Sequence, residues 1–202
     1  MSARHRRRTV IIAGHQGDAR TAAAHLDDPD ATVRAAALGG LDRLGSLTHE
    51  HITAAFADAA PEVRRRAAEL AGTRSGVSLI GLLGDDDPTV IEVAAWACGE
   101  QEQVDDDVLD RLIVLATGST EPLVREASAA ALGAIGDRRG LQAILTACTD
   151  KPNVRRRAVL ALAPFDGPDV EAAIDNALED RDWQVRQAAE DLRRAVGEID
   201  LS

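Results

Sequence analysis

Two runs of three arginines are the residues of this sequence whose type and spacing best suit chemistry with a ligand. They are Arg64-Arg65-Arg66 and Arg155-Arg156-Arg157. A guanidinium group holds a carboxylate or a phosphate through two parallel hydrogen bonds, so each run suits recognition of an acidic peptide or a phosphate. The alternative, which the sequence favours, is that these side chains are solvated and pair with nearby Asp and Glu residues.

Two further features suit a ligand less well. Trp96 stands among small residues and is either an anchor for a partner or a plug between helices, because Trp is enriched at interface hot spots. Trp183 lies in a turn, and we expect it to cover the end of the fold. In His49-Glu50-His51 the two imidazoles are two residues apart on a helix and point to different sides, so we expect no metal site and no cofactor.

These candidates belong to a pattern that recurs six times and predicts the elements that position them. Each copy has a turn, a Val that is usually followed by Arg, and a helix of small residues. The copies follow one another at 27 to 34 residues, which is typical of stacked repeats. The six residues at the Val position are Val33, Val63, Val90, Val124, Val154 and Val185.

The positions around each Val predict a helix, a tight turn and a second helix. The residue four after the Val is always small, which lets neighbouring helices approach closely. A Pro two residues before the Val suits the first turn of the second helix, and an apolar stretch of helical length precedes the turn. No segment has the strict alternation of a half-buried strand, and aromatic residues are only 2% of the chain, so the core must be Ala, Leu, Val and Ile. The Pro residues are Pro61, Pro88, Pro122 and Pro152.

The pattern resembles the HEAT repeat, in the short form found in phycobilin-lyase-like proteins. Phrases that carry the resemblance are Asp58-Ala59-Ala60-Pro61-Glu62-Val63-Arg64 and Asp180-Arg181-Asp182-Trp183-Gln184-Val185-Arg186. The resemblance implies an all-α fold, a right-handed, armadillo-like α-solenoid of about six HEAT-like helix-turn-helix repeats. We expect a basic N-terminal tail or cap over 1–16, one array over 17–197 and a C-terminal tail over 198–202. The repeats span 17–45, 46–74, 75–103, 104–136, 137–165 and 166–197.

The resemblance also implies a ladder in which an Asp and the Arg six residues later pair within and between neighbouring repeats. Asp85 faces Ile91, so the third repeat departs from the pattern. Arg125 and Arg155 have Ser119 and Thr149 at the Asp position, and we expect them to use a neighbouring repeat's carboxylate. The predicted pairs are Asp28/Arg34, Asp58/Arg64 and Asp180/Arg186.

In HEAT arrays the second helices usually line the concave face, so the resemblance predicts partner binding at their non-core positions. Positions two and six after the Val are the first choice, and position three joins them where the Arg runs fall. The predicted partner-binding residues are Trp96, Glu92, Arg65, Arg66, Glu126, Arg156 and Arg157.

Charge and cysteine content narrow the class of function. A net charge of −11 disfavours nucleic-acid and anionic-membrane binding, which need a basic face. No run approaches 18 apolar residues, so no membrane span is expected. The basic start of the chain has too short an apolar run for a signal peptide. Cys98 and Cys148 lie in predicted helices and form no disulfide framework, which favours the cytoplasm. We also expect a monomer.

No set of residues nominates an enzyme. Deoxyhypusine hydroxylases are HEAT proteins that bind iron through His-Glu pairs just after the Val phrase, and Ala35-Ala36 and Arg65-Arg66 stand at such positions here. We therefore expect a non-catalytic adaptor or scaffold that binds a protein partner on the concave face of the array. The alternative is an enzyme-associated HEAT protein, either a lyase-like subunit or a nucleic-acid binder related to DNA glycosylases.

Overall fold

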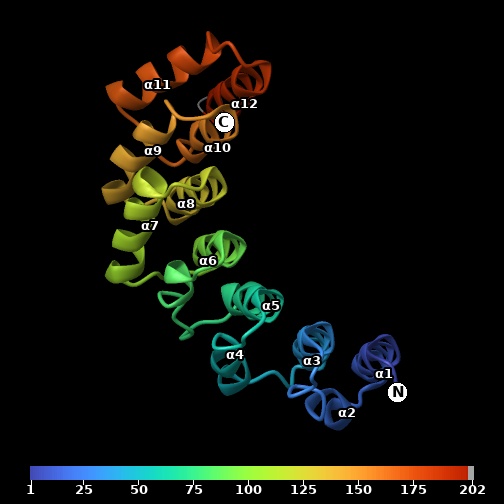
Figure 1. Cartoon of the computed structure of the whole chain (residues 1–202). Helices are drawn as coiled ribbons and strands as arrows, with labels where there is room; N and C mark the ends of the chain where they lie inside the picture. Colours follow the sequence, from blue (N-terminus) through green and yellow to red (C-terminus); the bar gives the residue numbers. More distant parts are fainter. Residues whose placement is uncertain (200–202) are drawn as a thin grey trace. The chain divides into compact units, whose positions relative to one another are not determined.

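The computed structural model describes residues 1–199, and within that range every regular element is a helix (Figure 1). None of the helices in this range is both long enough and apolar enough to cross a membrane. The elements are α1 (Ala3–Gln16), α2 (Ala19–Ala23), α3 (Ala31–Arg43), α4 (His49–Ala55), α5 (Pro61–Gly72), η1 (Leu82–Gly84, a 3₁₀ turn), α6 (Pro88–Glu100), α7 (Asp106–Gly118), α8 (Pro122–Ile135), η2 (Arg138–Gly140), α9 (Leu141–Ala147), α10 (Pro152–Ala161), α11 (Pro168–Leu178) and α12 (Trp183–Ile199).

After α1 the helices follow one another as pairs, with a short first helix or 3₁₀ turn and a longer second helix. The pairs are α2/α3, α4/α5, η1/α6, α7/α8, α9/α10 and α11/α12. A Pro is the first residue of α5, α6, α8 and α10, as the sequence predicts. The all-α fold of an α-solenoid with about six helix-turn-helix repeats is therefore confirmed, while its handedness stays a prediction.

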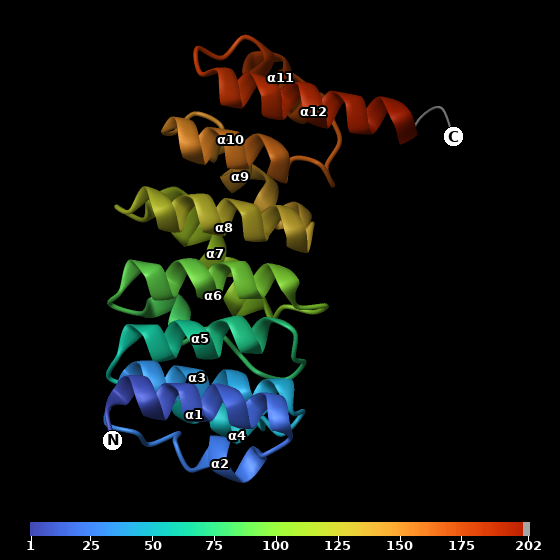
Figure 2. The same ribbon diagram turned by 90° about the vertical axis from the view of Figure 1, so that its right-hand side faces the viewer.

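The chain divides into two compact units, which are described separately. Unit 1 is Met1–Ala94, and unit 2 begins at Ala95. In unit 1 the second helix α3 packs against both α1 and α5 (Figure 1). In unit 2 α10 packs against both α8 and α12, and the three helices follow one another in the view of Figure 2.

Small side chains allow these second helices to pack closely. Each of the six Val residues is at most 2% exposed, and each small residue four positions later is completely buried. At Gly133 of α8, a Cβ atom would lie 2.6 Å from the Cα of Ala161 in α10, so no side chain fits there. The buried small residues are Ala37, Ala67, Ala94, Ser128, Ala158 and Ala189.

Of the two alternatives for residues 1–16, a tail or a cap, the structure favours a cap, because residues 3–16 form α1. Ser2 caps the helix with a side-chain hydrogen bond to the backbone N–H of His5. Val10, Ala13 and Gly14 are buried along one face of the helix, which packs on α3. The sequence did not predict this helix, because the run of arginines before Val10 leaves only a narrow stripe of apolar residues on one face.

Three smaller expectations also change. The first helix of the third repeat is reduced to η1, because the Gly76–Gly81 segment that holds the buried Val77 is rich in Gly and Ser, which favour loops. Trp183 is 64% exposed at the start of α12, so most of its side chain covers nothing. Of the predicted C-terminal tail, residues 198 and 199 belong to α12, and 200–202 lie outside the described residues.

Candidate partner-binding groove

The Arg that follows the repeat Val connects two successive turns of the solenoid. Arg34 donates through Nε and Nη2 to the carboxylate of Asp58, at 2.7 and 2.6 Å, and through Nη1 to the backbone carbonyl of Asp28, at 2.8 Å. The carboxylate of Asp58 also accepts the backbone N–H of Ala60 at 2.8 Å. One guanidinium therefore fixes the turn of its own repeat to the turn of the next repeat.

The same two-pronged ion pair recurs in both units. Unit 1 has three such rungs and unit 2 has two, and each joins an Arg to an Asp 21 to 25 residues further on. Planar, bidentate contact of this kind suits a residue that sets register. The rungs are Arg6–Asp28, Arg34–Asp58, Arg64–Asp85, Arg125–Asp150 and Arg155–Asp180.

The prediction that each Asp pairs with the Arg six residues later is therefore wrong, because each Asp pairs with an Arg of the preceding turn. The pairs predicted in this way are Asp28/Arg34, Asp58/Arg64 and Asp180/Arg186. Within a repeat the Arg donates to the backbone carbonyl of that Asp. In Arg34 and Arg64 the two remaining guanidinium nitrogens donate to the Asp of the next turn. The expectation that Arg125 and Arg155 use a neighbouring repeat's carboxylate is confirmed. Asp85 does not face Ile91 but accepts from Arg64 of the preceding repeat.

The rungs hold their carboxylates ionised. Hydrogen bonds from Arg6 lower the pKa of Asp28 to about 2, against the opposing effect of burial. Hydrogen bonds from the paired Arg likewise lower the pKa of Asp58, Asp85, Asp150 and Asp180. A carboxylate that is stabilised in its charged form in this way ties the stability of the fold to pH.

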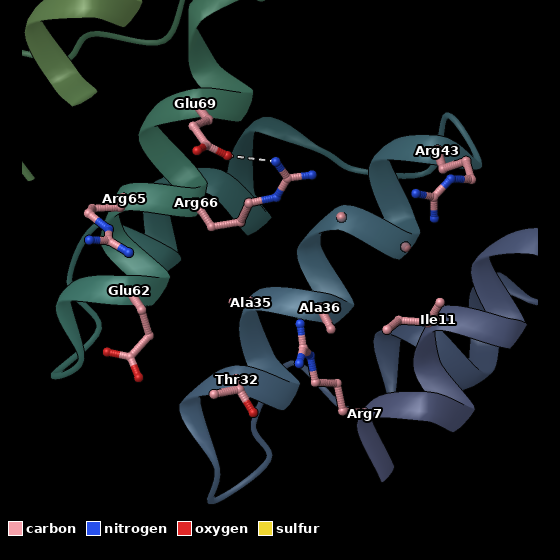
Figure 3. A pocket seen from close by; sticks show the side chains of 12 residues that line it. Arg7, Ile11, Thr32, Ala35, Ala36, Arg43, Glu62, Arg65, Arg66 and Glu69 are labelled. Carbon is pink, nitrogen blue, oxygen red and sulfur yellow. Dashed lines mark hydrogen bonds and ion pairs between the residues drawn. The ribbon is translucent and has the colours of Figure 1, made fainter. Parts of the chain in front are cut away.

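A groove of about 500 Å³ lies on unit 1, along the face of α3 between α1 and α5 (Figure 3). Its α3 side is made of small residues, including Ala35, Ala36 and Gly39, so little side-chain volume fills the space. From α5 the side chain of Arg66 reaches over Gly39, where an added Cβ would lie 2.9 Å from Nη2. The residues that line the groove are Arg7, Ile11, Thr32, Ala35, Ala36, Gly39, Gly40, Arg43, Glu62, Arg65, Arg66 and Glu69.

Four arginines and two glutamates line this groove, so it is locally basic on an acidic chain. Arg66 is paired with Glu69 at 2.6 Å (Figure 3). Arg65 donates only to the hydroxyl of Thr89, at 3.3 Å. Within the described residues, Arg7, Arg43 and Arg65 form no ion pair with a carboxylate, although Arg65 keeps its hydrogen bond to Thr89, and its charge adds to the hydrogen bonds from Thr89 that lower the pKa of Asp87.

The other predicted partner-binding residues are distributed over α6 and unit 2. Trp96 is 48% exposed on α6, so it is no plug between helices, and Glu92 lies one turn before it. In unit 2, Arg157 lies with Nε 3.8 Å from a carboxylate oxygen of Glu126, and Arg156 is half-buried on the same helix. The run Arg155-Arg156-Arg157 therefore divides into a buried rung, a half-buried side chain and a paired surface cation.

The sequence missed the wall that α1 contributes, Arg7 and Ile11, and the end residue Arg43. Arg7 and Ile11 are four residues apart and so lie on one face of α1. This spacing indicates a shared wall only if the segment is a helix. Metal chemistry gains no support from the His cluster: His51 Nδ1 accepts the backbone N–H of Thr48 in a capping box. Among the described residues, no group of three or more His, Cys, Asp or Glu side chains is placed to hold a metal ion.

A comparison with known families gives a match to HEAT repeats over residues 76–154. The Escherichia coli protein YibA is 20% identical and superposes with a TM-score of 0.69, covering 92% of this chain and 74% of its own, which supports the fold alone. Human deoxyhypusine hydroxylase is 18% identical, with a TM-score of 0.49 over 96% of this chain and 79% of its own, too low to carry an argument. No curated protein matches the chain.

The family match, the six copies of one pattern and the helix pairs support the same assignment. The phycobilin-lyase-like form of the repeat stays a prediction. Residues 76–154 match HEAT repeats, and the helix pairs on either side of them repeat the same pattern.

Proposed function

We propose that this protein is a non-catalytic adaptor that binds a protein partner in the groove of unit 1. The observation that carries the proposal is the composition of the groove. Positions two, three and six of two successive second helices, α3 and α5, line one hollow of about 500 Å³. Most of these positions lie outside the core, although Ala36 also packs against the core cluster of Val10, Val33 and Ala37. HEAT repeats commonly mediate contacts between proteins.

The chemistry of the lining favours binding over catalysis. Its side chains are Arg, Glu, Thr, Ile, Ala and Gly, and one of its two carboxylates, Glu69, is held by Arg66. Three guanidinium groups without a carboxylate partner, around a floor of small residues, instead suit an extended segment of another protein that approaches the backbone of α3.

The test is affinity purification with mass spectrometry from the native cell, with nuclease added. The groove variant is Ala35→Leu, which fills the floor with an apolar side chain and leaves every charge in place. The matched control is Ala130→Leu, which places the same side chain at position six of α8 in unit 2, where the native alanine is also half-buried. We expect proteins enriched by the wild type to fall at least tenfold with Ala35→Leu and to persist with Ala130→Leu.

Two results would contradict the proposal. Equal recovery of the same partners by wild type and Ala35→Leu would place the binding site elsewhere. If partners are enriched without nuclease but lost when nuclease is added, for the wild type and for both variants, the result would favour the nucleic-acid alternative.

A further inference from the structure

We infer that the groove of unit 1 recognises a short acidic segment, whose carboxylates bind Arg7, Arg43 and Arg65. This inference rests on the proposed function, because it assigns a chemical class to the partner of the same groove. It is carried by the contrast between the arginines that line the groove and those that hold the fold.

The arginines of unit 1 that fix its structure have partners. Arg6, Arg34 and Arg64 form the rungs, and Arg74 pairs with Asp42. Of the four groove arginines, Arg7, Arg43 and Arg65 have no carboxylate partner among the described residues, although 34 Asp and Glu residues outnumber 23 Lys and Arg residues in the chain. Arg7 and Arg43, together with Arg65, which donates only to the hydroxyl of Thr89, line one hollow of an acidic protein, and such cations suit the binding of an external anion.

The two glutamates of the groove weaken this basic character only in part. Glu69 is neutralised by Arg66 at 2.6 Å. Glu62 is one of the charges that raise the pKa of Arg34, so its own field is partly offset by that guanidinium. An excess of positive charge therefore remains at Arg7 and Arg43, on the opposite side of the groove from Glu62 and at its end (Figure 3).

The size of the groove favours a short peptide. From Thr32 to Arg43 the helix α3 rises about 16 Å, at about 1.5 Å per residue. An extended chain of about five residues covers that length. Ala35, Ala36 and Gly39 allow a peptide backbone to come close, and Ile11, which is 40% exposed, offers an apolar contact between the charges.

Screening explains how an acidic protein can bind an acidic ligand. At physiological ionic strength the Debye length is about 8 Å, so carboxylates far from the groove act weakly on a bound residue. The guanidinium groups that it contacts act at full strength. A short segment gains from these contacts, whereas a long polyanion such as DNA would extend beyond the groove onto an acidic chain, which favours the peptide.

The experiment measures binding of a fluorescein-labelled hexapeptide of alternating Glu and Leu by fluorescence polarisation at low salt. Its counterpart of alternating Gln and Leu and a labelled single-stranded oligonucleotide serve as competing probes. We expect the Glu peptide to bind at least tenfold more tightly than the Gln peptide, and its affinity to fall as salt is raised. The double variant Arg7→Gln/Arg65→Gln should weaken binding of the Glu peptide at least tenfold.

The control variant is Arg8→Gln/Arg20→Gln, which removes the same charge from the next residue of α1 and from α2, at residues that do not line the groove. It should change the affinity less than twofold, and circular dichroism should show both variants folded, since none of these four residues forms a rung. Equal binding of the Glu and Gln peptides, or equal effects of the two double variants, would overturn the inference. So would tighter binding of the oligonucleotide than of the Glu peptide.

These failures are distinct from failure of the proposed function. A partner that Ala35→Leu loses and Arg7→Gln/Arg65→Gln retains would leave the groove as the binding site and reject the acidic segment. A partner that both groove variants retain would reject the site itself.

Discussion

Units 1 and 2 share the Arg–Asp rungs but differ on the outer face of their second helices. In unit 1, α3 carries Ala35 and Gly39 at positions two and six, and its neighbours α1 and α5 stand around a groove. In unit 2, Arg157 of α10 lies 3.8 Å from Glu126 of α8, so its cation has a partner on the neighbouring helix. Repetition therefore fixes the scaffold, while the positions that vary between copies decide where a surface is available for a ligand.

Removing a rung should produce the largest loss of stability, and it should do so in either unit. Arg155 and Asp180 have side chains that are only 8% and 14% exposed, and Arg155→Ala leaves that carboxylate without its partner. We expect a loss of about 3 kcal/mol in the free energy of unfolding, measured by urea denaturation. Arg34→Ala in unit 1 should give a similar loss, and Arg156→Ala, which breaks no rung, should change stability by less than about 0.5 kcal/mol. If removing a rung lowers the free energy of unfolding no more than Arg156→Ala does, the rungs do not stabilise the scaffold that the two units share.

A methyl group added at a glycine should distinguish the packed contact between α8 and α10 in unit 2 from the open groove of unit 1. Gly133→Ala forces a Cβ to within 2.6 Å of the backbone of Ala161, and we expect a loss of about 2 kcal/mol despite the better helix propensity of Ala. Gly39→Ala in the groove meets only the end of the Arg66 side chain, which can move. Thermal denaturation should show Gly39→Ala as neutral or slightly stabilising, and a large loss there would mean that the groove floor is packed.

Acid should weaken both units through the same carboxylates. The folded pKa of each rung Asp is lowered below the unfolded value of about 3.9, so its contribution is complete above that pH and is lost as pH falls through the folded pKa. For Asp28 that pKa is about 2. The melting temperature should therefore fall between about pH 4 and pH 2, and Asp180→Asn should reduce the size of that fall. A melting temperature unchanged over this range would contradict the role of the rungs.

The smallest effect belongs to a buried hydroxyl in unit 2. Ser128 Oγ is completely buried and has no hydrogen-bond partner among the described residues, at a position where five of the six copies have Ala. Ser128→Ala should raise the free energy of unfolding by about 1 kcal/mol, because it removes an unsatisfied polar group. Its counterpart in unit 1, Ala37→Ser, should lower stability by a similar amount, and a gain there would show that the position tolerates a hydroxyl.

The sequence was sufficient for the scaffold because local rules determine it. Val at the turn, a small residue four positions later and Pro at the first helical position each act within one helix or between nearest neighbours. The register of the rungs was missed because a partner one repeat away is as compatible with the spacing as a partner within the repeat. One clue was present: the third copy has Ile91 for Arg and the fourth has Ser119 for Asp, so both members of one between-copy pair are missing together.

The groove could be predicted only in part. Positions two, three and six of the second helices do line it, and Arg65 and Arg66 are among its residues. One wall of the groove is α1, a helix that its run of arginines makes hard to predict because only three of its residues are buried. The width of the groove depends on the spacing of α3 from its neighbours. Such distances arise from packing between helices and leave no signature in one repeat.

Cysteine footprinting tests the central claim, that the groove of unit 1 and not the same face of unit 2 binds the acidic segment. Ala36→Cys and Ala127→Cys place a thiol at position three of α3 and α8, both at half-buried alanines. The native thiols should react slowly, because burial raises the pKa of Cys98 and Cys148 to about 12. With the Glu–Leu hexapeptide at saturation, alkylation by iodoacetamide should slow at least fivefold at residue 36 and stay unchanged at residue 127. Equal protection at both positions, or protection at residue 127 alone, would contradict the account.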